Sequence, residues 1–72
     1  MSNDELLKLG YKVRFARDKK GLTQEQLAEL SEISDTTIKL LERGKCNITV
    51  LNLLKIAEIL DLNLGIINNK EI

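Results

Sequence analysis

With 72 residues, the chain is long enough for one domain and no more. A single cysteine excludes an internal disulfide, and the absence of histidine removes the usual zinc sites and most acid–base constellations of hydrolases, so we expect no catalytic residues, no metal and no cofactor. The net charge is zero, so attraction to an anionic partner such as nucleic acid would have to come from a local basic face.

The N-terminal residues, Met-Ser-Asn-Asp-Glu, are polar and acidic, unlike a secretory signal. No apolar run in the sequence approaches the roughly 20 residues that are needed to cross a bilayer. We therefore expect a cytoplasmic protein with no membrane contact.

A basic amphipathic helix is predicted over residues 4–19, because apolar residues recur at helical spacing between Leu6 and Ala16. Gly21 should end this helix, since a residue without Cβ accepts the left-handed conformation that follows a helix C-terminus. Residues 8–20 hold six of the chain's eleven cations and form either a local basic face or simply a solvated side of the helix: Lys8, Lys12, Arg14, Arg17, Lys19 and Lys20.

Two short helices are predicted next. Thr23 can cap the first of them, and Gln26 three residues later completes the pairing of a capping box. Ser34 is a good N-cap for the second, which we expect to run from Asp35 to Arg43 and to stop at Gly44.

A fourth helix should begin with Asn47 or Thr49 as its cap and continue to Leu60, with mostly apolar residues at helical spacing. After Asp61 the period changes to two, which predicts a short strand with three apolar residues on one side: Leu62, Leu64 and Ile66.

This lone strand would leave its backbone hydrogen-bonding groups unpaired. Residues 63–72 therefore form either a dimerisation element, pairing with the same segment of a second copy across a two-fold axis, or a loose tail. We favour pairing through Leu62, Leu64 and Ile66, because the alternating apolar side chains need a surface to cover.

The two short helices have the spacing of a helix-turn-helix. A small residue at Ala28 lets the helices cross closely, Ile33 fills the turn, and Ile38 and Leu41 pack underneath. This geometry predicts that the outer face of the helix beginning at Asp35 protrudes, where a major groove can accept it.

Two longer motifs extend this pattern. The first runs from Arg17 through Gly21-Leu22-Thr23-Gln24 to Leu27-Ala28, and the second is Glu42-Arg43-Gly44-Lys45. With these motifs the chain resembles the Cro and lambda-repressor-like (Xre) family of bacterial DNA-binding domains over residues 8–62. The resemblance implies an all-α bundle with residues 1–62 as the DNA-binding domain. It also implies a sequence-specific repressor that binds a palindromic operator as a homodimer, with residues 35–43 in the major groove.

Individual roles also follow from the resemblance. Base contacts are expected from the first turn and outer face of the recognition helix: Asp35, Thr36, Lys39 and Leu40. Thr36 can bond a base edge or contact a thymine methyl, and Lys39 can bond guanine or a phosphate. Leu40 can contact only thymine methyls or pack elsewhere. Asp35 would accept from cytosine N4 or simply stabilise the helix N-terminus.

Phosphate contacts are expected from a second set: Thr23, Gln24, Ser34, Arg43, Lys45 and Asn47. Gln24 opens a helix, and the positive end of the helix dipole attracts phosphate. Arg17 and Glu42 match an internal ion pair of the family, so we assign both to structure.

The sequence departs from the family in two ways. Glu32 occupies the turn position where glycine is usual, so a left-handed backbone there would cost about 1–2 kcal/mol unless the turn adjusts. Glu29, Glu32 and Asp35 also place negative charge around the reading surface, so one subunit should bind weakly and two half-sites become necessary.

The C-terminal third resembles HipB-type antitoxin regulators, through Asn47-x-Thr49, the segments 54–56 and 60–64, and the alternating tail. This resemblance implies an autorepressor encoded beside a HipA-like kinase toxin and binding it. Two alternatives stay open: a stand-alone Xre-type regulator of a phage or a restriction–modification system, or a module that neutralises a partner without binding DNA. Leu40 and the acidic reading surface favour the last of these.

Overall fold

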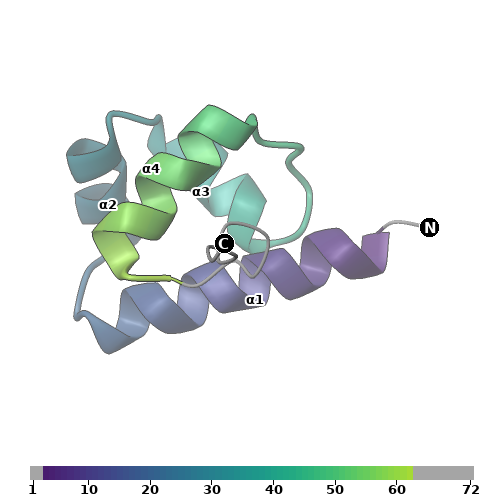
Figure 1. Ribbon diagram of the computed structural model, residues 1–72, viewed down its shortest axis with the longest axis horizontal. Helices are drawn as coiled ribbons and strands as arrows, with labels where there is room; N and C mark the ends of the chain where they lie inside the picture. The colour runs from purple at the N-terminus through teal and green to yellow at the C-terminus, as the bar shows by residue number, and fades with distance from the viewer. Residues whose placement is uncertain (1–2, 63–72) are drawn as a thin grey trace, which may run out of the picture.

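The computed structural model describes residues 3–62 of the chain, and within them the protein is an all-α bundle without strands. Figure 1 shows the longest helix along one edge of the molecule, with the other helices stacked on the same side of it. None of the described helices is long and apolar enough to span a bilayer. The helices are α1 (Asn3–Lys19), α2 (Gln24–Ser31), α3 (Asp35–Glu42) and α4 (Val50–Leu60).

The core is built from every one of these helices. α1 packs on α3 and α4, and α2 packs on the same two helices, so the four helices together enclose one core. Ala28 and Ile33 are buried at the crossing and turn of α2 and α3, with Ile38 and Leu41 fully buried beneath, as the helix-turn-helix spacing predicts. The remaining members of the buried cluster are Val13, Ala16, Leu27, Ile56 and Leu60.

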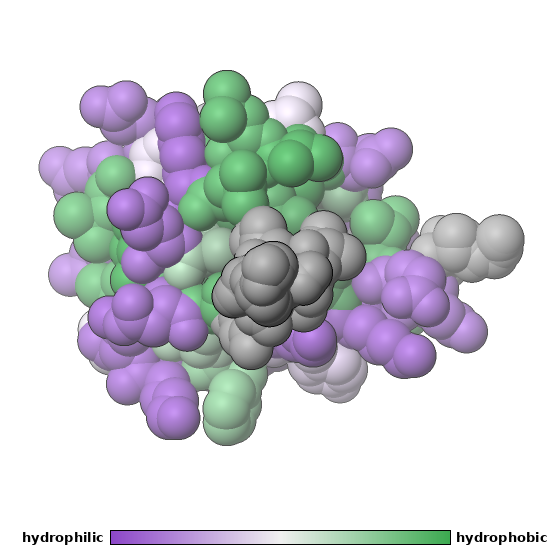
Figure 2. Space-filling view, viewed as in Figure 1, coloured by the Kyte–Doolittle hydropathy of each residue, from purple (hydrophilic) through white to green (hydrophobic). Residues whose placement is uncertain are grey.

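α4 buries less of its apolar surface than its sequence suggests. Ile56, Ala57 and Leu60 are buried, but Leu51 and Leu54 of the same helical pattern are 68% and 36% exposed. Figure 2 shows an apolar surface over the first part of α4 as a result. Helical spacing predicted the helix correctly but could not say how much of its circumference another element covers.

The helix starts follow the predicted caps. The Thr23 hydroxyl accepts from the Gln26 amide at 3.0 Å, and the Gln26 side chain accepts from the Thr23 amide at 2.8 Å, which completes the capping box. Ser34 caps α3 through its side chain. At α4 the choice between Asn47 and Thr49 falls on Thr49, whose hydroxyl accepts an amide hydrogen of the first turn.

All four described helices end in the same way. The residue after each last turn is left-handed, and the amide that follows it donates to a carbonyl five residues back, which is a Schellman motif. In three of these motifs the donor is an apolar residue that packs against the core: Leu22, Ile33 and Leu62. The left-handed residues are Gly21, Glu32, Gly44 and Asp61.

The predicted C-terminal strand falls mostly on residues outside the described part of the chain. Leu64 and Ile66 lie there, as does the segment 63–72 that was expected to mediate dimerisation. Leu62 is described, and it is part of the motif that ends α4: its amide donates to the Ala57 carbonyl at 2.8 Å, and its side chain packs against the core.

We expect Glu32→Gly to stabilise the protein. Glu32 adopts the left-handed conformation, with φ 61° and ψ 32°, so the turn has not adjusted to its side chain. Glycine removes about 1–2 kcal/mol of steric cost and adds about 0.5–1 kcal/mol of backbone entropy loss, leaving a net gain of about 0.5–1 kcal/mol. Urea unfolding measures the difference. Glu29→Gly, in the right-handed part of α2, is the matched control and should destabilise by about 1 kcal/mol.

Candidate nucleic-acid interface

α3 turns one face to the core and the other to solvent. Its buried side is formed by Ile38 and Leu41, whereas Thr36, Lys39 and Leu40 are exposed and Asp35 is half-buried at the first turn. The residues expected to contact bases form two adjacent pairs, 35–36 and 39–40, one helical turn apart, so they share the outward side of the helix. The structure therefore brings all of them together on one accessible surface.

A cationic hollow of about 580 Å³ lies beside this surface. Its lining comes from α1, α2, α3 and the residue that follows α3: Arg14, Arg17, Gln24, Lys39, Glu42 and Arg43. Gln24 and Arg43 were expected to bind phosphate, and the structure places them in one concave site with Lys39. We call this site the cationic hollow.

Arg14 is the residue of the cationic hollow that no motif singled out. It is exposed on α1, three positions before Arg17, and so faces the same side of the helix. The only signal in the sequence was its membership of the basic cluster of the first helix. Which of those cations faces the recognition helix depends on how α1 packs on α3.

Arg17 and Glu42, the expected structural pair, lie in direct contact at the base of the cationic hollow. The guanidinium donates to both carboxylate oxygens, at 2.6 and 3.0 Å, and its remaining nitrogen donates to the Leu22 carbonyl at 2.7 Å. Their side chains are only 11% and 4% exposed. Hydrogen bonding to Glu42 raises the pKa of Arg17 above its ordinary value, so the guanidinium stays charged.

Gln24 is held by the same carboxylate. Its amide nitrogen donates to Glu42 Oε1 at 3.1 Å, and because an amide carries two hydrogens, the second can be donated outward. Gln24 is also the first residue of α2, where the helix dipole favours an anion. The pair Arg17–Glu42 thus positions a donor at the rim of the cationic hollow.

The other expected phosphate contacts are distributed differently. Thr23 accepts within the capping box and keeps its hydroxyl hydrogen for a further acceptor. Ser34 donates to the Thr37 hydroxyl at 2.9 Å while capping α3, so its hydrogen is already used. Lys45 and Asn47 are exposed in the segment between α3 and α4 and do not line the cationic hollow.

Lys39 sits between two carboxylates. Its ammonium lies 3.6 Å from Asp35 Oδ2, one turn earlier on α3, and 3.8 Å from Glu25 Oε2 on α2. These distances exceed that of a strong hydrogen bond, and the lysine side chain is 47% exposed. Each contact is therefore worth about 0.2–1 kcal/mol.

The charges of the reading surface are segregated. A second hollow, at the turn between α2 and α3, is lined by four carboxylates together with Ala28, Ile33 and Ser34. The anions expected around the reading surface therefore gather on the side away from the cationic hollow, with Lys39 between the two regions. The four carboxylates are those of Glu25, Glu29, Glu32 and Asp35.

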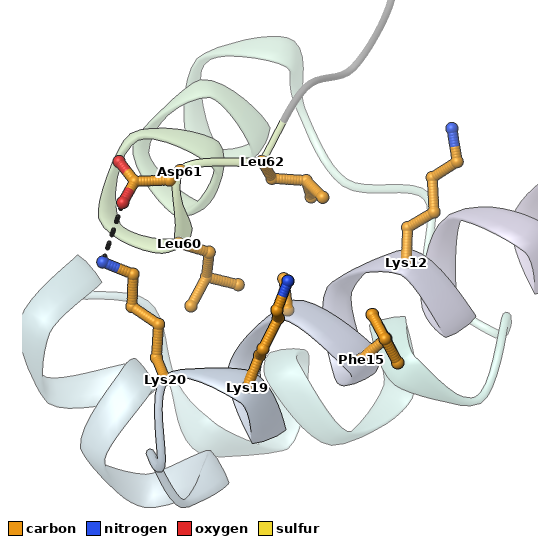
Figure 3. Close-up of a pocket in the computed structure, with 8 residues that line it drawn as sticks. Lys12, Phe15, Lys19, Lys20, Leu60, Asp61 and Leu62 are labelled. Carbon is orange, nitrogen blue, oxygen red and sulfur yellow. Dashed lines mark ion pairs between the residues drawn. The ribbon is translucent and has the colours of Figure 1, made fainter.

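A third hollow, of about 540 Å³, lies between α1 and the end of α4 (Figure 3). Lys20 pairs there with Asp61 at 2.9 Å, and the ammonium of Lys19 lies 6.0 Å from the centre of the Phe15 ring. Of the described residues expected at a functional site, it takes in Leu62 alone. It belongs to a different face from the recognition helix.

Comparison with known proteins places this geometry in context. A family model described as helix-turn-helix, HTH_3, matches residues 13–67. No curated protein matches the chain. Among solved structures, the restriction–modification controller protein C.AhdI from Aeromonas hydrophila is similar, with 39% identity and a TM-score of 0.79 over 85% of this chain and 88% of that one.

Two further solved structures have the same fold. The restriction–modification controller protein C.Esp1396I is 33% identical, with a TM-score of 0.75 over 85% of this chain and 80% of that one. The clp gene regulator ClgR from C. glutamicum is 29% identical, with a TM-score of 0.78 over 86% of this chain and 80% of that one.

Proposed function

The chain belongs to the HTH_3 helix-turn-helix family of DNA-binding transcription regulators, and we propose that it acts as a homodimer that places one α3 in each of two successive major grooves of an operator. One observation carries this proposal: the outward side of α3 is accessible and stands directly beside the cationic hollow. A helix fits the major groove, whose rims are the phosphates that such a hollow can hold.

The residues divide the work between positioning and reading. Arg14, Gln24 and Arg43 line the cationic hollow and would bind phosphates of one DNA strand. The positive end of the α2 dipole, at Gln24, would attract the same phosphates. Thr36 can then bond a base edge or contact a thymine methyl, and Lys39 can bond guanine.

Two copies are needed because one copy offers few phosphate contacts. The whole chain carries no net charge, and the carboxylates at the turn oppose the attraction of the cationic hollow. A dimer doubles the contacts, and its two recognition helices would lie about 34–36 Å apart to match successive major grooves.

The similarity to two restriction–modification controllers favours the stand-alone regulator among the alternatives. We propose that the protein controls the genes of a restriction–modification system. The HipB-type antitoxin role, with a HipA-like kinase toxin as partner, stays a prediction from residues 47–64. The adjacent reading frame separates the two: a methyltransferase or endonuclease gene supports the controller, and a kinase-like gene supports the antitoxin.

We expect the double variant Arg14→Ala/Arg43→Ala to bind DNA more weakly by about 10- to 100-fold for each copy of the homodimer, since each lost charged contact costs about 1 kcal/mol or more. The slope of log affinity against log salt should fall in magnitude by about 4, because the homodimer loses two phosphate contacts in each copy. The measurement is fluorescence anisotropy on a duplex that the wild-type protein selects from a random library.

Lys55→Ala, which removes an exposed cation from α4, is the matched control and should leave affinity unchanged. Unaltered binding by the double variant would show that DNA is not held by the cationic hollow. If the wild-type protein selects no duplex, the module that neutralises a partner without binding DNA would be the better explanation.

A further inference from the structure

We infer that Glu25 and Asp35 are specificity-determining residues: by holding Lys39 in an acid–lysine–acid cluster, they penalise DNA that lacks the right bases under α3. The inference rests on the proposed function and deepens it. It gives a role in specificity to carboxylates beside α3 that would otherwise only weaken binding to DNA.

The cluster joins both helices of the helix-turn-helix. Asp35 lies one turn before Lys39 on α3, whereas Glu25 reaches the same ammonium from the first turn of α2. Lys39 is also part of the lining of the cationic hollow, so it stands at the border between the positive and negative halves of the surface. The Lys39 ammonium can therefore either attract a phosphate or contact the two carboxylates.

The charge balance of the cluster decides how it meets phosphate. One ammonium and two carboxylates sum to a net charge of −1, so approach of a phosphate is repelled unless Lys39 leaves its partners. Phosphates are the same at every position on DNA, so this repulsion weakens binding to all sequences. Specificity rises only if a particular base pair compensates for it.

A G·C pair offers that compensation. In the major groove guanine O6 and N7 accept from lysine, and cytosine N4 donates to a carboxylate. O6 and N4 are hydrogen-bonded to each other within the pair and so lie about 2.9 Å apart, similar to the 3.6 Å between the charged groups of Lys39 and Asp35. Lys39 and Asp35 can therefore give up their contact with each other, so that Lys39 donates to guanine O6 and Asp35 accepts from cytosine N4 of the same base pair.

The neighbouring acids provide an internal comparison. Glu29 is one turn beyond Glu25 on α2, is exposed, and lines the same hollow at the turn between α2 and α3. In the described part of the chain, however, no ion pair joins Glu29 to Lys39. An effect of charge alone would be similar for Glu25 and Glu29. An effect that acts through Lys39 would be confined to Glu25 and Asp35.

The test compares Glu25→Gln, Asp35→Asn and Glu29→Gln, each with its fold checked by thermal unfolding. Affinities are measured for two probes: a duplex that the wild-type protein selects from a random library, and a random-sequence duplex of the same length. We expect Glu25→Gln and Asp35→Asn each to bind the random duplex about three- to fivefold more tightly. The ratio of selected to random affinity should fall for both variants and change little for Glu29→Gln.

A Lys39→Met background sharpens the result. There, Glu25→Gln and Asp35→Asn should no longer lower the ratio, because the residue through which they act is gone. The inference is overturned if the ratio is unchanged, if Glu29→Gln lowers it equally, or if the loss persists without Lys39; a wild-type protein that still selects a duplex leaves the proposed function standing. If the wild-type protein enriches no sequence, both fall together.

Discussion

Glu42→Ala is expected to lower the free energy of unfolding by about 3 kcal/mol, at the low end of the 3–5 kcal/mol typical of a broken buried ion pair. The carboxylate accepts from Arg17 and from Gln24 and is almost fully buried, so its loss leaves a guanidinium without its partner in a largely closed site. Arg17 keeps a contact with Asp18 at 3.3 Å and some exposure to water, which is why we choose the lower value. Urea unfolding followed by far-ultraviolet circular dichroism measures the change.

Two further variants test the cause. Glu58→Ala removes an exposed carboxylate from α4 and should change stability by less than about 0.5 kcal/mol. Arg17→Met/Glu42→Met should be more stable than Glu42→Ala, because it leaves no unpaired charge behind. If Glu42→Ala were as stable as Glu58→Ala, the pair would be a surface contact rather than a structural one.

Gly10→Ala is expected to destabilise the protein by about 2 kcal/mol. A Cβ at this position would lie 2.6 Å from the Leu41 carbonyl oxygen and 2.8 Å from that of Glu42. Both are backbone atoms at the end of α3, so the two helices would have to separate. Alanine favours a helix by about 1 kcal/mol over glycine, and overpacking of this kind must exceed that gain.

The measurement is the midpoint of thermal unfolding, where 2 kcal/mol corresponds to a fall of about 8–16 °C for a domain of this size. Lys8→Ala is the matched control on the same helix: it is exposed, and its midpoint should stay nearly unchanged. A higher midpoint for Gly10→Ala would mean that α1 and α3 do not approach as closely as described.

Local signals predicted the helices well because each depends on residues that are close in sequence. Thr23 with Gln26 marked one start, and Gly21 and Gly44 marked two ends, all with physical causes that act within a few residues. Asp61 was harder, since a left-handed aspartate gives no signal as clear as a glycine.

The site was predicted less completely because it depends on contacts between helices. Arg14 enters the cationic hollow only because α1 packs on α3, and Glu25 meets Lys39 only because α2 crosses α3. Gly10 carries no pattern in the sequence that would reveal the close approach at its Cα. The family resemblance gave Thr36 and Lys39 as expected base contacts but could not give their neighbours from other helices.

The carboxylate of Glu42 has a consequence for the thermodynamics of DNA binding. By accepting from Arg17 on α1 and Gln24 on α2 while belonging to α3, it fixes three helices relative to one another before any ligand arrives. Preorganised donors lose little conformational entropy on association. The heat capacity change of operator binding should therefore reflect the contact surface alone, without the large additional decrease that accompanies coupled folding.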